Sequence, residues 1–235
     1  MKTVYAHAVR PAPEPASYSI WHVLLDLAAV SAFVSAMTLL LISLALNSGK
    51  VWGSQAYAEW LLPLVAVLAL LAADFVSGFV HFLADNFGNP QTPLFGRVFI
   101  FPFREHHVDP KAITRHSYLE TNGANSLISL PVVFSVLCFT SGEEAFFLRL
   151  FVFFFLAAIF FTNQIHKWAH ADAPPGLVRY LQEWGLILSP ENHSVHHTAP
   201  HDEYYCITGG WLNAALKKMR FFSAVKWILT AGKKP

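Results

Sequence analysis

Histidines are concentrated in four short stretches of this chain, and their spacing is that of metal ligands. The chain has 235 residues and twelve histidines, four of them in "ENHSVHHTAPH" at residues 191–201. Neutral imidazole binds Fe, Cu, Zn and Ni, so such clusters predict a metal site. Apart from His7 and His22, the histidines form four groups: His81; His106, His107 and His116; His166 and His170; and His193, His196, His197 and His201.

The stretch at 191–201 predicts a short helix that presents three histidines together. His193 is three residues before His196 and four before His197, so the three rings share one face if the segment is helical. Pro200 ends such a helix because proline has no N–H to continue it. We therefore expect His201 to lie beyond the helix, as a ligand or as a residue that supports one.

Two other groups follow from the same helical geometry. In "NQIHKWAH", His166 and His170 are four residues apart, a spacing that lets both rings reach one metal. In "FREHHVDPKAITRH", the adjacent His106 and His107 diverge by about 100° on a helix, so the pair can face two directions or two metals. His116 ends that stretch, again as a ligand or a supporting residue.

The number of histidines indicates two metals. One zinc ion takes three or four protein ligands, so eight or more imidazoles exceed the needs of a single ion. The zinc-protease pattern H-E-x-x-H is absent, since Lys167 follows His166. Ligand softness alone does not choose among the metals that imidazole binds.

The elements that carry these histidines are those of an all-α integral membrane protein. Hydrophobic residues make up 54% of the chain and charged residues only 13%, far below the roughly 25% of a soluble domain. We expect a flexible tail at 1–19 and a single membrane domain at 20–235. Runs of apolar residues long enough for membrane helices, or nearly so, predict four spans at 21–46, 60–84, 125–140 and 145–168.

Lys and Arg residues predict the orientation of these spans. They are frequent in the connection 85–124 and in the region after 169, and scarce in the two opposite loops. The positive-inside rule then places all four histidine groups on the cytoplasmic side, of a bacterial inner membrane or of the endoplasmic reticulum. Residues 176–188 and 211–229 mix apolar, basic and Trp residues, as interfacial helices do. Helices packed on the cytoplasmic part fit them equally well.

The second predicted span carries ionisable residues along one helix face. In "DFVSGFVHFLAD", Asp74, His81 and Asp85 share one helix face, and such residues inside a membrane usually mark function. The alternative is that Asp85 already lies at the interface and that His81 reaches toward it. Gly78 is expected to allow a neighbouring helix to approach closely.

Charge and cysteine content exclude other classes. A net charge of +1 provides no basis for nucleic-acid binding, and two cysteines are too few for a disulfide framework. Cys138 lies in an apolar run and is expected to be buried. Neither a dinucleotide-binding G-x-G-x-x-G nor a haem-attachment C-x-x-C-H occurs.

The predicted metal site and its expected position at the membrane surface together indicate an enzyme that acts on lipids. A site at the membrane surface has access to lipid, and two irons among histidines can activate O₂ to attack an unactivated C–H bond. Because the chain has no motif for a redox cofactor, the electrons are expected from a separate carrier protein.

Four motifs carry a family resemblance. "FREHHVDPKAITRH" with "LETNGAN", "FTNQIHKWAH" and "HSVHHTAPHDEYYCITGGWLN" closely resemble the plasmanylethanolamine desaturase family, which includes a plastid branch acting on the acyl chain of phosphatidylglycerol. The resemblance runs from about Asp74 to Asn213, roughly 60% of the chain.

The resemblance implies an oxidoreductase that forms the vinyl-ether double bond of plasmalogens from an alkyl ether phospholipid. It implies two Fe ions, O₂ as co-substrate, and electrons from cytochrome b5 or an equivalent such as ferredoxin. All ten histidines of the four groups match the family motifs. Asp85 stands where acyl-CoA desaturases have a second histidine, so its role as ligand, outer partner or catalytic helper is open.

Roles can be ranked within this set. The expected ligands are His81, His106, His107, His166, His170, His193, His196 and His197, with His116 and His201 ranked lower. Carboxylates that could orient the rings are Asp85, Asp109, Glu120 and Asp172. Cations that could meet the lipid phosphate are Arg104, Lys111 and Arg115.

Two alternatives remain at this stage. A membrane fatty acyl desaturase or a lipid hydroxylase shares the iron chemistry, and histidine spacing cannot separate these activities. A non-enzymatic membrane metal-binding protein is the other alternative. A metal carrier needs polar residues along its spans, and three of the four predicted spans have few.

Overall fold

The computed structural model describes residues 18–54, 58–92, 96–230 and 232, and within these ranges it contains helices and no strand. Four helices are long and apolar enough to cross a membrane. This confirms the prediction of an all-α membrane protein with four spans. The four are α1 (Ile20–Ser54), α2 (Ala58–Asn86), α5 (Tyr118–Phe139) and α6 (Phe146–Ala169).

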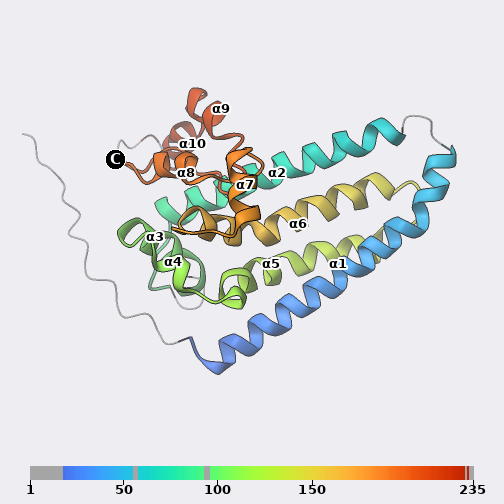
Figure 1. Ribbon diagram of the computed structural model, residues 1–235, viewed down its shortest axis with the longest axis horizontal. Coiled ribbons are helices and arrows are strands. Elements are labelled where there is room, and N and C mark those ends of the chain that lie inside the picture. Colours follow the sequence, from blue (N-terminus) through green and yellow to red (C-terminus); the bar gives the residue numbers. More distant parts are fainter. Residues whose placement is uncertain (1–17, 55–57, 93–95, 231, 233–235) are drawn as a thin grey trace, which may run out of the picture.

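The four long helices lie side by side in the spatial order α1, α5, α6, α2 (Figure 1). Apolar side chains of α1, α5 and α6 form the largest core cluster, in which the rings of Phe33 and Phe160 stack with centroids 5.1 Å apart. Many large apolar side chains on the outer surfaces are exposed, as expected where lipid is the solvent. Examples are Leu39, Leu46, Trp60 and Leu64.

The third long helix begins at Tyr118, well before the apolar run at 125–140. Its start is fixed by a capping box: Ser117 Oγ accepts from the Glu120 amide at 3.2 Å, and Glu120 Oε2 accepts from the Ser117 amide at 3.3 Å. The sequence signal is S-x-x-E in "SYLE". The polar residues after it are therefore helical and lie beside α6.

A buried arginine joins three helices at the end of α6 opposite its histidines. Arg149 Nε donates to Thr140 Oγ1 at 2.9 Å, and its other nitrogens donate to the Thr140 carbonyl and to Ser43 Oγ. Three oxygens thus solvate the guanidinium, which links α1, the C-terminus of α5 and the start of α6.

Short helices gather toward the other end of the four long ones (Figure 1). They are the π-helix η1 (Gly96–Ile100), α3 (Phe101–Val108), α4 (Ala112–Arg115), α7 (Gly176–Glu183), α8 (Pro190–His196), α9 (Asn213–Lys218) and α10 (Phe221–Leu229). Together with the ends of α2 and α6 they enclose the histidines.

Both stretches predicted to be interfacial pack on the protein with one face and expose apolar residues on the other. Residues 211–229 form two helices, α9 and α10, separated by Arg220 in the left-handed region at φ 52°. Phe222 of α10 packs against Phe82 of α2. Trp227 and Trp184 are exposed. The placement of these faces in the membrane interface remains a prediction.

Two expectations about packing were wrong. Cys138 is exposed on α5, because a membrane helix can turn an apolar residue toward lipid rather than toward the core. Gly78 is approached by a loop and not by a helix. A Cβ at Gly78 would lie 2.5 Å from Cys206 Sγ and 3.0 Å from the Cys206 amide.

We therefore expect Gly78→Ala to destabilise the protein by about 1–3 kcal/mol, the usual cost of overpacking a core. Thermal unfolding of the purified protein in detergent measures the effect. Gly53→Ala is the matched control, because nothing lies within 4 Å of a Cβ at Gly53. Equal midpoints for both variants would contradict the close contact.

Candidate metal centre

Eight of the ten predicted histidines gather into two groups that share one member. The five-histidine group consists of His106, His166, His170, His193 and His197, and the four-histidine group of His81, His106, His107 and His196. In each group the candidate ligand atoms lie within 4.8 Å of one another. Such convergence is what a pair of bound metal ions requires.

The rings come from four helices that are distant in the sequence. The end of α6 provides His166 and His170, and α3 provides His106 and His107, which diverge as predicted for neighbours on a helix. The other members are His81 on α2, His193 and His196 on α8, and His197 at its C-terminal cap.

The predicted shared face of α8 is divided between the two groups. His193 and His197 belong to the five-histidine group, whereas His196 belongs to the four-histidine group. Three rings on one side of a short helix still fan out, so neighbours three and four residues apart can serve different ions.

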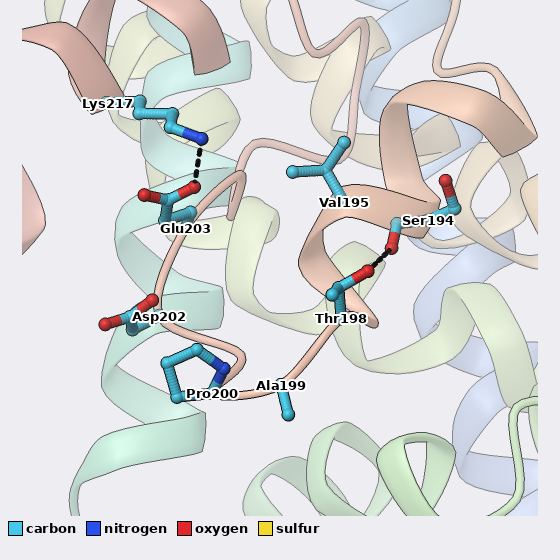
Figure 2. Close-up of a pocket in the computed structure, with 8 residues that line it drawn as sticks. All are labelled: Ser194, Val195, Thr198, Ala199, Pro200, Asp202, Glu203 and Lys217. Carbon is cyan, nitrogen blue, oxygen red and sulfur yellow. Dashed lines mark hydrogen bonds and ion pairs between the residues drawn. The ribbon is translucent and has the colours of Figure 1, made fainter.

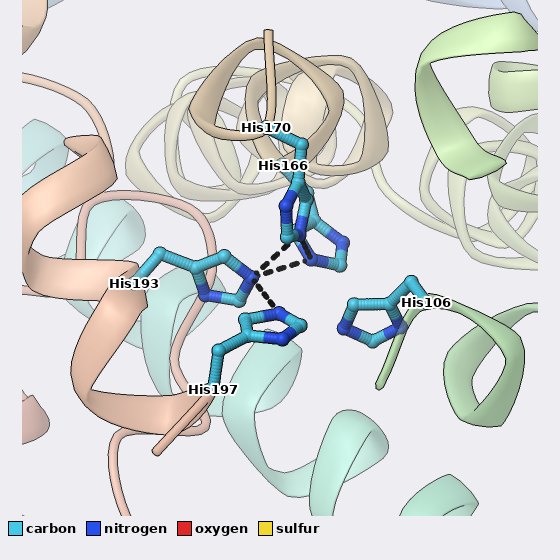
Figure 3. Close-up of side chains that lie close together, drawn as sticks. All are labelled: His106, His166, His170, His193 and His197. Carbon is cyan, nitrogen blue, oxygen red and sulfur yellow. Dashed lines mark hydrogen bonds between the residues drawn. The ribbon is translucent and has the colours of Figure 1, made fainter. Parts of the chain in front are cut away.

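Hydrogen bonds among the rings of the five-histidine group cannot account for the close approach of their nitrogens. His193 Nε2 lies 2.9 Å from both His166 Nε2 and His170 Nε2, and 3.0 Å from His197 Nε2 (Figure 3). A ring nitrogen has either one hydrogen or one lone pair and can complete only one of these contacts. Nitrogens each about 2.1 Å from one ion are separated by roughly 3.0–3.4 Å. The observed spacing therefore fits a shared cation.

The four-histidine group includes an acidic partner. Asp85 Oδ2 lies 3.1 Å from His107 Nε2, 3.3 Å from His81 Nε2 and 3.4 Å from His196 Nε2. Three buried atoms at the centre have no hydrogen-bond partner in the part of the chain that the structure describes: His81 Nε2, His106 Nε2 and Asp85 Oδ1. Nitrogen and oxygen donors of this kind fit a divalent metal ion.

Backbone carbonyls orient three of the rings through their other nitrogen. His81 Nδ1 donates to the Tyr205 carbonyl at 3.1 Å, His196 Nδ1 to the Glu203 carbonyl at 2.7 Å, and His106 Nδ1 to the Pro102 carbonyl at 3.3 Å. A proton on Nδ1 leaves the lone pair of Nε2 directed at the centre.

Of the four carboxylates expected to orient rings, Asp85 contacts rings of the four-histidine group, and the other three have partners outside the two groups. Asp109 pairs with Arg115 at 2.5 Å, and Asp172 pairs with Lys111 at 2.5 Å. Glu120 caps α5. These residues lie near basic side chains and a helix N-terminus, both of which attract carboxylates.

Two predicted histidines stand outside both groups. His116 is partly exposed before α5, with Nδ1 4.0 Å from Glu120 Oε1. His201 lies beyond α8, as expected, with Nδ1 3.0 Å from the His196 carbonyl and its ring centroid 4.9 Å from that of His107.

The cations expected to meet the lipid phosphate are engaged by the protein. Arg104 donates to the Ala84 carbonyl at 3.0 Å and to the Phe87 carbonyl at 2.8 Å, at the end of α2. Lys111 and Arg115 form the ion pairs described above. The structure therefore gives no support to a headgroup site at these three residues.

A surface pocket of about 340 Å³ lies on the outer side of α8 (Figure 2). There the Glu203 carboxylate pairs with Lys217 at 2.5 Å, while the carbonyl of the same residue holds His196. The pocket is lined by Ser194, Val195, Thr198, Ala199, Pro200, Asp202, Glu203 and Lys217.

Sequence analysis missed the contribution of the loop before α9. Tyr205 is 1% exposed, and its ring packs on those of His81 and His196. Burial raises the pKa of its phenol. The signal available in the sequence was the motif "CITGGWLN", to which no chemical role could be attached.

Burial keeps the rings in the form that binds metals. It lowers the pKa of His170 to about 4 and of His197 to about 2, assisted by the positive charge that neighbouring groups would carry. The same causes hold the pKa of His106 and His193 well below the ordinary value. Neutral imidazole has the free lone pair that metal binding requires.

Comparison with known proteins agrees with this geometry. The model of the lipid desaturase domain matches residues 70–235. The chain belongs to the lipid desaturase family. It is 46% identical to the plasmanylethanolamine desaturase of Myxococcus xanthus, over 88% of this chain and 71% of that protein. It is 44% identical to plasmanylethanolamine desaturase 1 of Mus musculus, over 76% and 70% of the two chains.

A plant relative is more distant. The chain is 35% identical to the chloroplastic fatty acid desaturase 4 of Arabidopsis thaliana, over 67% of this chain and 48% of that protein. No solved structure matches significantly. The predicted resemblance is thus confirmed: this member of the lipid desaturase family is a membrane-bound oxidoreductase. That result removes the alternative of a non-enzymatic metal-binding protein.

Acid should destabilise the metal-free enzyme. A histidine with a pKa near 4 when folded and near 6.5 when unfolded takes up its proton on unfolding, so stability falls as pH drops from 6.5 toward 4. For His170 the loss is about 2 kcal/mol at pH 5.

Thermal unfolding of chelator-treated protein at pH 7.5 and pH 5 measures this loss, with His170→Asn expected to show a smaller difference between the two. Identical midpoints of the parent protein at both pH values would contradict the buried neutral state.

Proposed function

We propose that this lipid desaturase introduces the vinyl-ether double bond into an alkyl ether phospholipid, converting plasmanylethanolamine to plasmenylethanolamine. The observation that carries the proposal is the pair of adjoining histidine groups in a chain similar to two proteins named plasmanylethanolamine desaturase. O₂ is the proposed co-substrate and iron the proposed metal.

The eight histidines of the two groups are the proposed ligands. Each group would hold one iron, with Asp85 facing the iron of the four-histidine group. His106 is in both groups but would bind only one of the irons, because its Nδ1 donates to the Pro102 carbonyl and its Nε2 has a single lone pair. Two irons would bind and activate O₂, which is the oxidant, so that hydrogen can be removed from an unactivated C–H bond. We propose that His116 and His201 are not ligands, because the structure places both outside the two groups.

The overall reaction defines what must reach the site. Two adjacent carbons beside the ether oxygen each lose one hydrogen, and O₂ becomes two molecules of water. Balance requires two further electrons and two protons. The electrons are proposed to come from a separate carrier protein such as cytochrome b5 or ferredoxin.

The residues of the chain contribute orientation and water exclusion. His81, His193 and His196 are each no more than 1% exposed, so these three rings are shielded from bulk water. Carbonyls fix the rings before substrate arrives, so little reorganisation accompanies the reaction. The Asp85 carboxylate lies among three rings and can adjust the charge of the four-histidine group.

The membrane placement is also a proposal. The histidine centre is assigned to the cytoplasmic side of a bacterial inner membrane or of the endoplasmic reticulum, because basic residues are frequent in the segments that enclose it. Residues 20–235 are proposed to act as one domain.

An acyl chain is the second candidate substrate, because a relative named fatty acid desaturase 4 is 35% identical over 67% of this chain. Such a reaction uses the same centre and differs in where the reacting carbons lie along the lipid. A lipid hydroxylase also shares the centre, but the family comparison favours desaturation.

Cells given this chain and an alkyl ether phosphatidylethanolamine should form acid-labile vinyl-ether lipid in air, and none without O₂. His196→Ala should lower the yield by at least about 100-fold, since even outer partners of metal ligands contribute 10- to 100-fold. Mass spectrometry before and after mild acid measures the product.

His22→Ala is the control and should keep full activity, because His22 lies at the start of α1 and bonds Ser19. Hydroxylated ether lipid as the only product would indicate a hydroxylase. Unsaturation confined to acyl chains would support the second candidate.

The purified chain should bind two iron ions. His170→Ala removes a ligand of the five-histidine group alone, and His107→Ala removes one of the four-histidine group alone. Each is expected to reduce the content toward one iron per chain, by elemental analysis, while His22→Ala retains two. One zinc per chain with no iron would overturn the di-iron proposal.

A further inference from the structure

We infer that Asp74 is a positioning residue for the four-histidine group, acting through the segment 203–213, here called the clamp segment. The inference rests on the proposed two-metal centre. Asp74 lies on α2, seven residues before His81, and is fully buried. Its spacing in the sequence puts it on the same helix face as His81 and Asp85 but indicates no specific role.

The carboxylate of Asp74 accepts hydrogen bonds from three backbone amides of the clamp segment. Asp74 Oδ1 accepts from the amides of Gly209 and Gly210, each at 2.8 Å, and Oδ2 accepts from the Leu212 amide at 3.1 Å. Hydrogen bonds to a carboxylate are among the stronger ones in proteins. Three of them at one buried side chain fix the path of the backbone.

Other polar groups complete the clamp. Ser77 Oγ, one turn after Asp74, accepts from the Ile207 amide at 3.1 Å. Asn213 Oδ1 accepts from the Cys206 amide at 2.9 Å, and Asn213 Nδ2 donates to the Cys206 carbonyl at 3.0 Å. A buried irregular backbone must find such partners, because an unpaired amide costs as much as a lost hydrogen bond.

The backbone that Asp74 fixes also accepts hydrogen bonds from two of the histidine rings. The Tyr205 carbonyl accepts from His81 Nδ1, and the Glu203 carbonyl accepts from His196 Nδ1. Both rings belong to the four-histidine group. A single helix, α2, thus carries the residue that fixes the segment and a ring that the segment orients, which sets the register between them.

The geometry points to a selective effect. Within the described residues, the hydrogen bonds from the clamp segment to the rings of the two groups end on His81 and His196. Loss of the Asp74 carboxylate should therefore weaken the metal in the four-histidine group more than that in the five-histidine group. A purely structural aspartate would affect both metals and the whole fold in parallel.

The test compares Asp74→Asn with Asp26→Asn in the full-length protein in detergent. Asp26 is the matched control, a carboxylate on α1 that accepts from Tyr18. In metal-free protein, Asp74→Asn should raise amide hydrogen exchange in residues 203–213, whereas Asp26→Asn should leave these amides unchanged.

Iron titration followed by Mössbauer spectroscopy supplies the second readout. Affinity for one of the two irons should fall about 10- to 100-fold in Asp74→Asn, with a changed spectrum for that iron alone and the other affinity within about threefold. Ser77→Ala removes one hydrogen bond to the clamp segment and should cause the same selective change to a smaller extent. This variant keeps the test available if Asp74→Asn does not fold.

An equal loss of affinity for both irons in Asp74→Asn would overturn the inference. Hydrogen exchange and iron affinities that are unchanged in both Asp74→Asn and Ser77→Ala would also overturn it. Failure of the proposed function is a separate result, since it requires that the parent protein itself not bind two irons. The exchange measurement on metal-free protein tests the clamp in either case.

Discussion

The structure depends on one electrostatic requirement: buried imidazole nitrogens face one another at distances where they cannot satisfy one another. Lone pairs at 2.9–3.3 Å repel, and protonation is opposed by burial and by the adjacent rings. A cation shared by several rings removes the conflict. The fold must therefore hold these side chains together against their own repulsion whenever the metal is absent.

The long and the short helices divide this work. Two spanning helices provide rigid supports, α6 with two rings one turn apart and α2 with His81 and Asp85. The short helices α3 and α8 approach from other directions and supply the rest. His106 belongs to both groups, so a displacement of α3 would disturb both groups at once.

The spacing of residues predicted much of this arrangement, and the remainder has definite physical reasons. The pair His166 and His170 and the divergence of His106 and His107 follow from helical geometry alone. Helical spacing shows which rings share a helix face but not which of the two groups each ring joins. The membership of His196 in the four-histidine group could therefore not be predicted. The four spans were predicted because hydrophobicity is local. The start of α5 was missed because its first turns are polar and are held by a cap.

Long-range contacts account for the other differences. The partners of Arg104 and Lys111 are chosen by tertiary proximity, which no spacing within one motif reveals. The role of Asp74 needs two segments separated by 135 residues to meet. The orienting groups of His81 and His196 are carbonyls, and every residue type carries one.

The use of main-chain carbonyls as acceptors for His81 and His196 has a genetic consequence. The acceptors for two ligand rings belong to the main chain at positions 203 and 205, so substitutions of those side chains leave the acceptors chemically intact. A deletion or insertion of one residue between Tyr205 and Gly209 would shift both carbonyls out of register with the rings. The two acceptors are therefore insensitive to the identity of the side chains at 203 and 205 but sensitive to the length of the loop.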